Sequence, residues 1–343
     1  MNFSSDNASG VHPRIMAALA AANEGATPSY GRDTLTERAQ DAVREMLDAP
    51  GAAVFMIGTG TGANALVLSQ LCPPWGRIFC HRTAHIETSE SGAPQWMAGG
   101  AQIALVDGEA GRMSPAALVA RIGDYPQVDE HDGKNAVLSV TNATEWGTVY
   151  HAASVAALAD VAHNADMTVH IDGARFANAV VATGAAPADL THRAGVDALS
   201  LGGTKGGCLA LEAVVIFDPA RARDFEFRRM RAGHLWSKHR FLAAQMLAWL
   251  EGGLWLDLAR HANAAAAELA AGLTAAGFPP LVSVEANEVF VRLPRDLTAR
   301  LRAQGLRAAD WPVPQDDAEN GTIRLVTSWA TTQAEVRALL AGV

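Results

Sequence analysis

Leu199-Ser200-Leu201-Gly202-Gly203-Thr204-Lys205-Gly206-Gly207 is the stretch on which the interpretation of this 343-residue chain depends. An apolar run ends there in glycines, and one lysine stands among them. Glycine lets the backbone approach a flat ligand, and ligands of α/β proteins bind at the carboxyl ends of strands. Only three of the 27 Lys and Arg residues are lysines. Because a lysine can form a Schiff base and an arginine cannot, Lys205 is a candidate catalytic residue rather than a chance surface lysine.

Composition places the chain among ordinary globular enzymes. Its length allows one large domain and a smaller one, and 49% hydrophobic and 18% charged residues are typical of such proteins. A net charge of -9 without a basic stripe argues against a nucleic-acid partner. The three cysteines show no metal-ligand spacing, and we find neither a signal pattern nor an apolar run of ~18 residues. We therefore expect a cytoplasmic protein without a membrane partner.

Apolar strand patterns alternate with helical patterns over residues 52–217. This alternation predicts an α/β fold with a mainly parallel, seven-stranded sheet covered by helices on both faces. Two long helical stretches follow, and short strands and helices near the C-terminus predict a smaller α+β domain. The expected strands are 52–57, 77–80, 101–106, 135–141, 167–171, 196–201, 211–217, 288–293 and 322–327. The expected helices begin at Pro13 and cover 34–47, 62–71, 114–122, 152–164, 175–182, 219–250, 254–277, 296–304 and 331–341.

Gly58-Thr59-Gly60-Thr61-Gly62-Ala63-Asn64-Ala65 follows the first expected strand and opens a helix. Backbone N–H groups at the positive end of a helix form an anion site that suits a phosphate. Residues 58–63 also fit a loose dinucleotide fingerprint, but Cys80-His81-Arg82 ends the next strand where a ribose-binding acid would stand. A tight turn without a ligand is the alternative interpretation.

His170-Ile171-Asp172-Gly173-Ala174-Arg175 ends another apolar strand. Asp172 is expected to face the crevice at the carboxyl edge of the sheet, and Arg175 offers a fork for a carboxylate. Alone, the two residues fit a structural ion pair equally well. Together with Lys205 and the anion site they form the set that pyridoxal phosphate requires: a Schiff-base lysine, an acid for the pyridine nitrogen and a phosphate site.

His85 follows the second expected strand, in Ala84-His85-Ile86-Glu87. Its imidazole would either lie on the cofactor ring or act as a base, because imidazole titrates near neutral pH. A structural core histidine is the other interpretation. Asp129-Glu130-His131-Asp132 is expected to be a solvated turn rather than a metal site.

These motifs together resemble the low-specificity L-threonine aldolases, which depend on pyridoxal phosphate and have the aspartate-aminotransferase-like fold type I. The resemblance covers nearly the whole chain. It implies an N-terminal segment (1–12) at the active site, a cofactor-binding large domain (13–250) and a small C-terminal domain (251–343). The motifs that occur in the family's order are Ser5-Asp6-Asn7, Tyr30-Gly31, Gly60-Thr61, Ala84-His85, the run from His170 to Asn178, Gly203-Thr204-Lys205 and Ile323-Arg324-Leu325-Val326.

The resemblance also implies roles for single residues. Lys205 would bind the cofactor as a Schiff base, Asp172 would pair with its pyridinium nitrogen, and His85 would lie on its ring. Ser5, Arg175 and Arg324 would hold the substrate carboxylate. Further implied contacts come from Gly60 and Thr61 to the phosphate, from Thr204 and Arg175 to the cofactor, from Tyr30 to the substrate, and from Lys238 to the phosphate of a neighbouring subunit in a homodimer or homotetramer.

The implied activity is cleavage of L-threonine, L-allo-threonine and related β-hydroxy-α-amino acids to glycine and an aldehyde, together with the reverse addition. Some family members carry a histidine after the fourth strand, where this chain reads Asn142-Ala143-Thr144-Glu145-Trp146-Gly147. Two candidates therefore remain for the base that takes the β-hydroxyl proton, His85 and Glu145. We favour His85, because an imidazole is well matched to proton transfer near neutral pH.

Other activities fit parts of the sequence. A β-eliminating lyase or an aminotransferase would use the same Lys205 and Asp172 and would differ in its products. A nicotinamide-dependent oxidoreductase would depend on residues 58–63 alone and would leave Lys205 unexplained. A non-enzymatic binding protein is disfavoured, because the polar groups gather at strand ends rather than over an exposed face.

Overall fold

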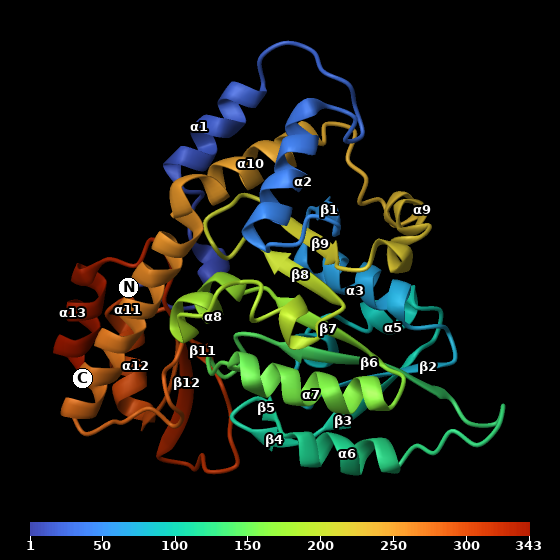
Figure 1. Cartoon of the computed structure of the whole chain (residues 1–343). Coiled ribbons are helices and arrows are strands. Elements are labelled where there is room, and N and C mark those ends of the chain that lie inside the picture. Colours follow the sequence, from blue (N-terminus) through green and yellow to red (C-terminus); the bar gives the residue numbers. More distant parts are fainter.

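The computed structural model describes residues 1–343 and has a seven-stranded sheet at its centre (Figure 1). The strand order is β1-β9-β8-β7-β6-β2-β3, and every strand except β9 runs in the same direction. The predicted seven-stranded, mainly parallel sheet is therefore confirmed. The strands are β1 (Ala53–Ile57), β2 (Gly76–His81), β3 (Gln102–Val106), β6 (Lys134–Thr141), β7 (Thr168–Gly173), β8 (Ala198–Gly202) and β9 (Glu212–Ile216).

Helices cover both faces of this sheet, which explains why its strands read as nearly unbroken apolar runs. One face carries α3 (Gly60–Leu71), α5 (Ala93–Met97) and α9 (Phe225–Arg231). A two-stranded hairpin, β4 (Gly108–Glu109) and β5 (Arg112–Met113), follows β3. The helices packed into the core of the other face are α1 (Pro13–Ala22), α2 (Thr34–Met46), α6 (Pro115–Gly123), α7 (Ala152–Asn164), α8 (Phe176–Thr183) and α10 (Arg240–Leu250).

A smaller antiparallel sheet, in the order β10-β12-β11, forms the C-terminal part of the chain. Phe3 is buried in its core, and Val326 N donates to Phe3 O at 2.8 Å. Both chain ends lie in this part of the molecule (Figure 1). Its elements are α11 (Leu254–Ala275), β10 (Glu288–Pro294), α12 (Arg295–Ala303), β11 (Ala309–Asp310), β12 (Asn320–Val326) and α13 (Gln333–Gly342).

The predicted division between residues 250 and 251 falls between α10 and α11 and stays a prediction. α11 packs on α8 of the large sheet and on α13 of the small one, so it joins the two parts. No helix combines the length and the apolar composition that a membrane span requires.

The expectation of one helical stretch over 219–250 is wrong. A short 3₁₀ turn and α9 end before an irregular segment, 232–239, and α10 follows. Gly233 has φ +75°, the left-handed conformation that ends helices. The segment packs on the turn between β1 and α3: a Cβ on Gly58 would collide with the Trp236 ring, and one on Gly62 with the His234 ring. Tertiary packing, not helix propensity, therefore decides its path.

Trp249 on α10 supports the backbone beside Lys205. Its side chain is fully buried, and Nε1 donates to Gly206 O at 3.0 Å. Trp249→Ala leaves a cavity and an unpaired carbonyl, so we expect the free energy of unfolding in urea to fall by about 3–5 kcal/mol. The control is Trp96→Ala, since Trp96 is 80% exposed and its loss should cost less than about 1 kcal/mol. Equal losses of unfolding free energy in the two variants would contradict the role of Trp249 in supporting the backbone beside Lys205.

Candidate active site

A polar pocket of about 430 Å³ opens where the carboxyl ends of the parallel strands meet. The turns after β1, β2, β6, β7 and β8 contribute to it, and only four of its 19 lining residues are hydrophobic. Asn7 of the N-terminal segment also lines it. The predicted site residues that the pocket brings together are Gly60, Thr61, His85, Glu145, Asp172, Arg175, Thr204 and Lys205.

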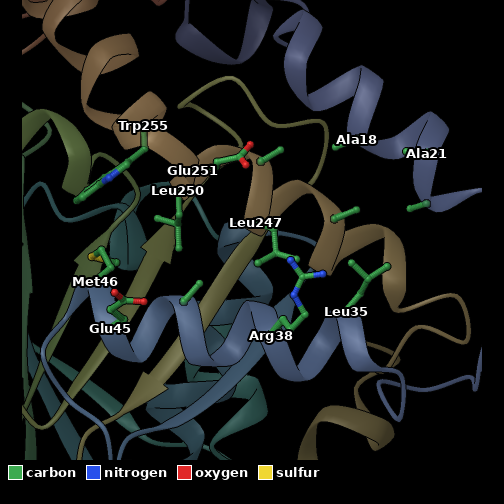
Figure 2. A pocket seen from close by; sticks show the side chains of 14 residues that line it. Ala18, Ala21, Leu35, Arg38, Glu45, Met46, Leu247, Leu250, Glu251 and Trp255 are labelled. Carbon is green, nitrogen blue, oxygen red and sulfur yellow. The ribbon is translucent and has the colours of Figure 1, made fainter.

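A second cavity, of about 700 Å³, lies between α1, α2 and α10 (Figure 2). Hydrophobic residues make up 11 of its 14 lining residues, among them Leu35 and Leu247, and the other three, Arg38, Glu45 and Glu251, are charged. It gathers no set of converging polar groups. The polar pocket at the strand ends is therefore the candidate active site.

The turn after β1 forms an anion site. α3 begins at Gly60, two residues before the predicted start, and Thr59 is its N-cap: Thr59 Oγ1 accepts a hydrogen bond from Gly62 N at 3.1 Å. The N–H groups of Gly60 and Thr61, in the first turn, have no carbonyl partner within the helix. Both residues line the pocket, so these donors and the positive end of α3 suit a phosphate.

Lys205 and Asp172 stand at the ends of neighbouring strands, β8 and β7. Lys205 is partly exposed to the pocket, and none of the chain's ion pairs engages its amine. Asp172 is 3% exposed. Its Oδ1 accepts from Ala174 N at 3.0 Å and its Oδ2 from Asn64 Nδ2 at 2.8 Å. The carboxylate is thus held in one orientation beside a free amine.

His85 begins a single helical turn, α4 (His85–Thr88), after β2. Its Nδ1 lies 2.8 Å from Glu90 Oε1, and its backbone N–H donates to Glu145 Oε1 at 2.7 Å. Glu145 Oε1 also accepts from Thr141 Oγ1 at 3.0 Å, whereas Oε2 is buried without a partner. Burial, and then the nearby Asp172 charge, raise the pKa of Glu145 to about 7.

Arg175 lies in a buried charge cluster beside the pocket. Its Nε and Nη2 donate to Asp6 at 2.7 and 3.1 Å, and its Nη1 lies 3.3 Å from Glu288. Arg324 Nη1 lies 3.7 Å from the same Glu288. Burial raises the pKa of Glu288, while the two arginines act in the opposite direction. Asp6 and Glu288 thus face all three guanidinium nitrogens of Arg175, and one N–H on each terminal nitrogen is left outside these pairs.

Four predicted residues do not line the pocket: Ser5, Tyr30, Arg324 and Lys238. Ser5 Oγ accepts from Asn7 N at 3.1 Å, so it lies next to a pocket residue. Tyr30 is 46% exposed, and its N–H donates to Ser237 O at 3.0 Å, beside the exposed Lys238. The roles assigned to these four residues stay predictions.

The structure adds pocket residues that sequence reasoning missed. Asn64 lies one turn after the glycines of α3, and Glu90 lies five residues after His85; a polar side chain at helical spacing in an apolar run was the available signal for Asn64. Glu212 begins the antiparallel strand β9, which places it at the carboxyl edge of the other strands. Burial raises the pKa of Glu212 to about 7. Only the strand direction shows that Glu212 belongs to the site.

The fold and the site define an α/β protein in which a lysine, an aspartate and the N-terminus of a helix meet at the strand ends. Residues 2–295 match the family described as beta-eliminating lyase. The chain belongs to this family.

Within the family, the chain falls with the low-specificity L-threonine aldolases. It is 38% identical to the low specificity L-threonine aldolase of Pseudomonas sp. (strain NCIMB 10558), over 99% of this chain and 96% of that relative. It is 39% identical to the enzyme of the same name from Pseudomonas aeruginosa, over 98% and 95%. The solved threonine aldolase of Leishmania major has a TM-score of 0.93 at 27% identity, covering 99% of this chain and 97% of that one. The resemblance found in the sequence is confirmed.

The raised pKa of Glu145 makes stability depend on pH. The folded chain holds this proton up to about pH 7, whereas an unfolded carboxyl loses it near 4.5, so the free energy of unfolding falls as the pH rises between these values. We expect cofactor-free Glu145→Gln to exceed the wild type by roughly 2–3 kcal/mol at about pH 8 and to match it near pH 4. Urea unfolding at both pH values measures this, with exposed Glu109→Gln as the control. A gain in stability that does not vary with pH would contradict the raised pKa of Glu145.

Proposed function

We propose that this chain cleaves β-hydroxy-α-amino acids, L-threonine and L-allo-threonine among them, to glycine and an aldehyde, and catalyses the reverse addition. The observation that carries the proposal is the meeting of Lys205, Asp172 and the N-terminus of α3 in one pocket. Relatives named low specificity L-threonine aldolase at 38–39% identity support the substrate class. The enzyme is a lyase, as its membership of the beta-eliminating lyase family shows.

The residues present fit pyridoxal phosphate, which is the cofactor. The free N–H groups of Gly60 and Thr61 would hold its phosphate, with Thr204 nearby, and the carboxylate of Asp172 would pair with its ring nitrogen. The free amine of Lys205 would bind it covalently. When bound, the cofactor supplies an electron sink for the pair left at Cα when the Cα–Cβ bond breaks.

The arginines position the substrate. The remaining donors of Arg175 would bind its carboxylate, with Ser5 and Arg324 as further contacts and Tyr30 on the substrate side. A fixed carboxylate fixes the direction of the Cα–Cβ bond, so this bond breaks rather than others. Asp6 and Glu288 hold the Arg175 guanidinium in place beside the pocket.

His85 would take the β-hydroxyl proton at its Nε2, and the oxygen would then become the aldehyde carbonyl as the Cα–Cβ bond breaks. A proton returned to Cα yields glycine. Glu145 is the alternative base, because its Oε2 is buried without a partner and its pKa is raised to about 7. We favour His85, whose ring is 41% exposed and open to the pocket.

We further propose a cytoplasmic homodimer or homotetramer in which Lys238 reaches the phosphate site of a neighbouring subunit. The exposed position of Lys238 beside Tyr30, outside its own pocket, supports this arrangement. The three cysteines are all free and buried, which fits a reducing compartment.

Product analysis tests the proposal. The wild type incubated with L-threonine and pyridoxal phosphate should release glycine and acetaldehyde in equal amounts, and Lys205→Ala should lower the rate by at least about 1,000-fold. Lys134→Ala, at an exposed lysine, is the matched control and should keep the wild-type rate. Ammonia and a keto acid would instead indicate a β-eliminating enzyme, and amino transfer an aminotransferase.

Arg324→Ala tests the carboxylate assignment. Loss of a charged donor should raise KM for L-threonine about 10-fold, with a smaller change in kcat. Exposed Arg337→Ala serves as the control. A change confined to the preference among aldehyde side chains would show that Arg324 does not serve the carboxylate.

A further inference from the structure

We propose that Glu90 is a positioning residue for the reaction: it holds His85 with the ring proton on Nδ1, so that Nε2 is the atom that accepts the β-hydroxyl proton. This inference rests on the proposed function, in which His85 is the base. The buried Glu90 carboxylate has no part in the contacts proposed for the cofactor or the substrate, and this inference gives it a role.

Glu90 is enclosed beside the pocket. Its side chain has no exposed surface, and its Oε1 lies 2.8 Å from His85 Nδ1 and 2.9 Å from Asn64 Nδ2. These two contacts are the hydrogen bonds of the side chain, and neither involves a backbone group. The Glu90 carboxylate is thus not a helix cap or a turn-forming group, and it is directed at the imidazole.

The hydrogen bonds of Asn64 indicate which atom donates in the contact between Glu90 and His85. Its Nδ2 has two hydrogens, and it donates to Asp172 Oδ2 at 2.8 Å and to Glu90 Oε1. Because Glu90 Oε1 already accepts a hydrogen bond from Asn64 Nδ2, we assign Oε1 as the acceptor toward His85 as well, so that the hydrogen of the 2.8 Å contact belongs to Nδ1. A neutral imidazole that carries its hydrogen on Nδ1 has its lone pair on Nε2.

Two contacts hold His85. Glu90 holds the ring at Nδ1, and Glu145 holds the backbone by accepting the His85 N–H at 2.7 Å. The His85 side chain is nevertheless 41% exposed and lines the pocket, and its Nε2 forms no hydrogen bond within the protein. When Nε2 takes a proton, the charge that appears on the ring lies next to the Glu90 carboxylate and is stabilised by it.

Among the charged groups around His85, Glu90 alone forms a hydrogen bond with the ring. The other charged groups are Glu87 on the same helical turn and those that line the same pocket: Glu145 after β6, Asp172 at the end of β7, Glu212 at the start of β9, Arg175 and Lys205. Removing the Glu90 carboxylate should therefore disturb the His85 ring more than removing the Glu87 carboxylate.

Kinetics over pH test the proposal. With L-threonine and saturating pyridoxal phosphate, Glu90→Gln should lower kcat by about 10- to 100-fold, with KM within about threefold of the wild type. The acidic limb of the kcat profile should move to lower pH by at least about half a unit, because the imidazolium loses its neighbouring anion. Glu87→Gln is the matched control and should leave both kcat and the limb unchanged.

The tautomer is measured directly on the wild-type protein without cofactor, by ¹⁵N NMR of labelled histidines, with His85→Gln identifying the signal. The hydrogen is expected on Nδ1, and in Glu90→Ala it should move in part to Nε2. A wild-type imidazole with its hydrogen on Nε2 overturns the proposal, even if every Glu90 variant fails to fold.

The kinetic outcomes are equally decisive. A lower kcat without movement of the acidic limb would show a merely structural role for Glu90 and overturns the proposal, as does an unchanged kcat. If the wild type releases no glycine from any β-hydroxy amino acid, the proposed function fails. The tautomer measurement does not depend on activity, so it still tests whether Glu90 holds the hydrogen of His85 on Nδ1.

Discussion

The common direction of six of the seven strands in the large sheet is the constraint on which the site depends. Because β1, β2, β6, β7 and β8 point the same way, the turns that follow them all end at one edge. Each turn then needs only one or two functional residues, and the sheet brings the anion site, His85, Glu145, Asp172 and Lys205 into one pocket. The antiparallel β9 contributes to the same edge through its first residue, Glu212.

Burial of charge at this edge links stability to chemistry. Asn64 holds the carboxylates of Glu90 and Asp172 with the hydrogens of one amide, and Asp6 holds Arg175. Glu145 and Glu212 have pKa values raised to about 7 by burial, so each stays protonated at a pH where an exposed carboxyl is charged. Such groups reduce stability near neutral pH, and they cluster at functional sites because proton transfer there needs them.

The local sequence was sufficient to predict the large sheet and the functional residues at the ends of its strands. Apolar runs ending in glycine or a charged residue predicted the large sheet, and the order of those ends placed Lys205, Asp172 and Gly60 together. The stretch 219–250 was predicted wrongly, because the break at 232–239 depends on packing against Gly58 and Gly62. The pairing of Arg175 with Asp6, residues that lie far apart in the sequence, and the place of Glu212 depend on tertiary structure and strand direction, which periodicity does not contain.

The central claim is that Lys205 binds the cofactor covalently, and one measurement addresses it directly. The protein is incubated with pyridoxal phosphate, reduced with borohydride and digested, and the modified peptide is identified by its mass. The chain has three lysines, so the result is unambiguous. We expect the reduced adduct on Lys205; an adduct confined to Lys134 or Lys238, or none at all, would contradict the role of Lys205.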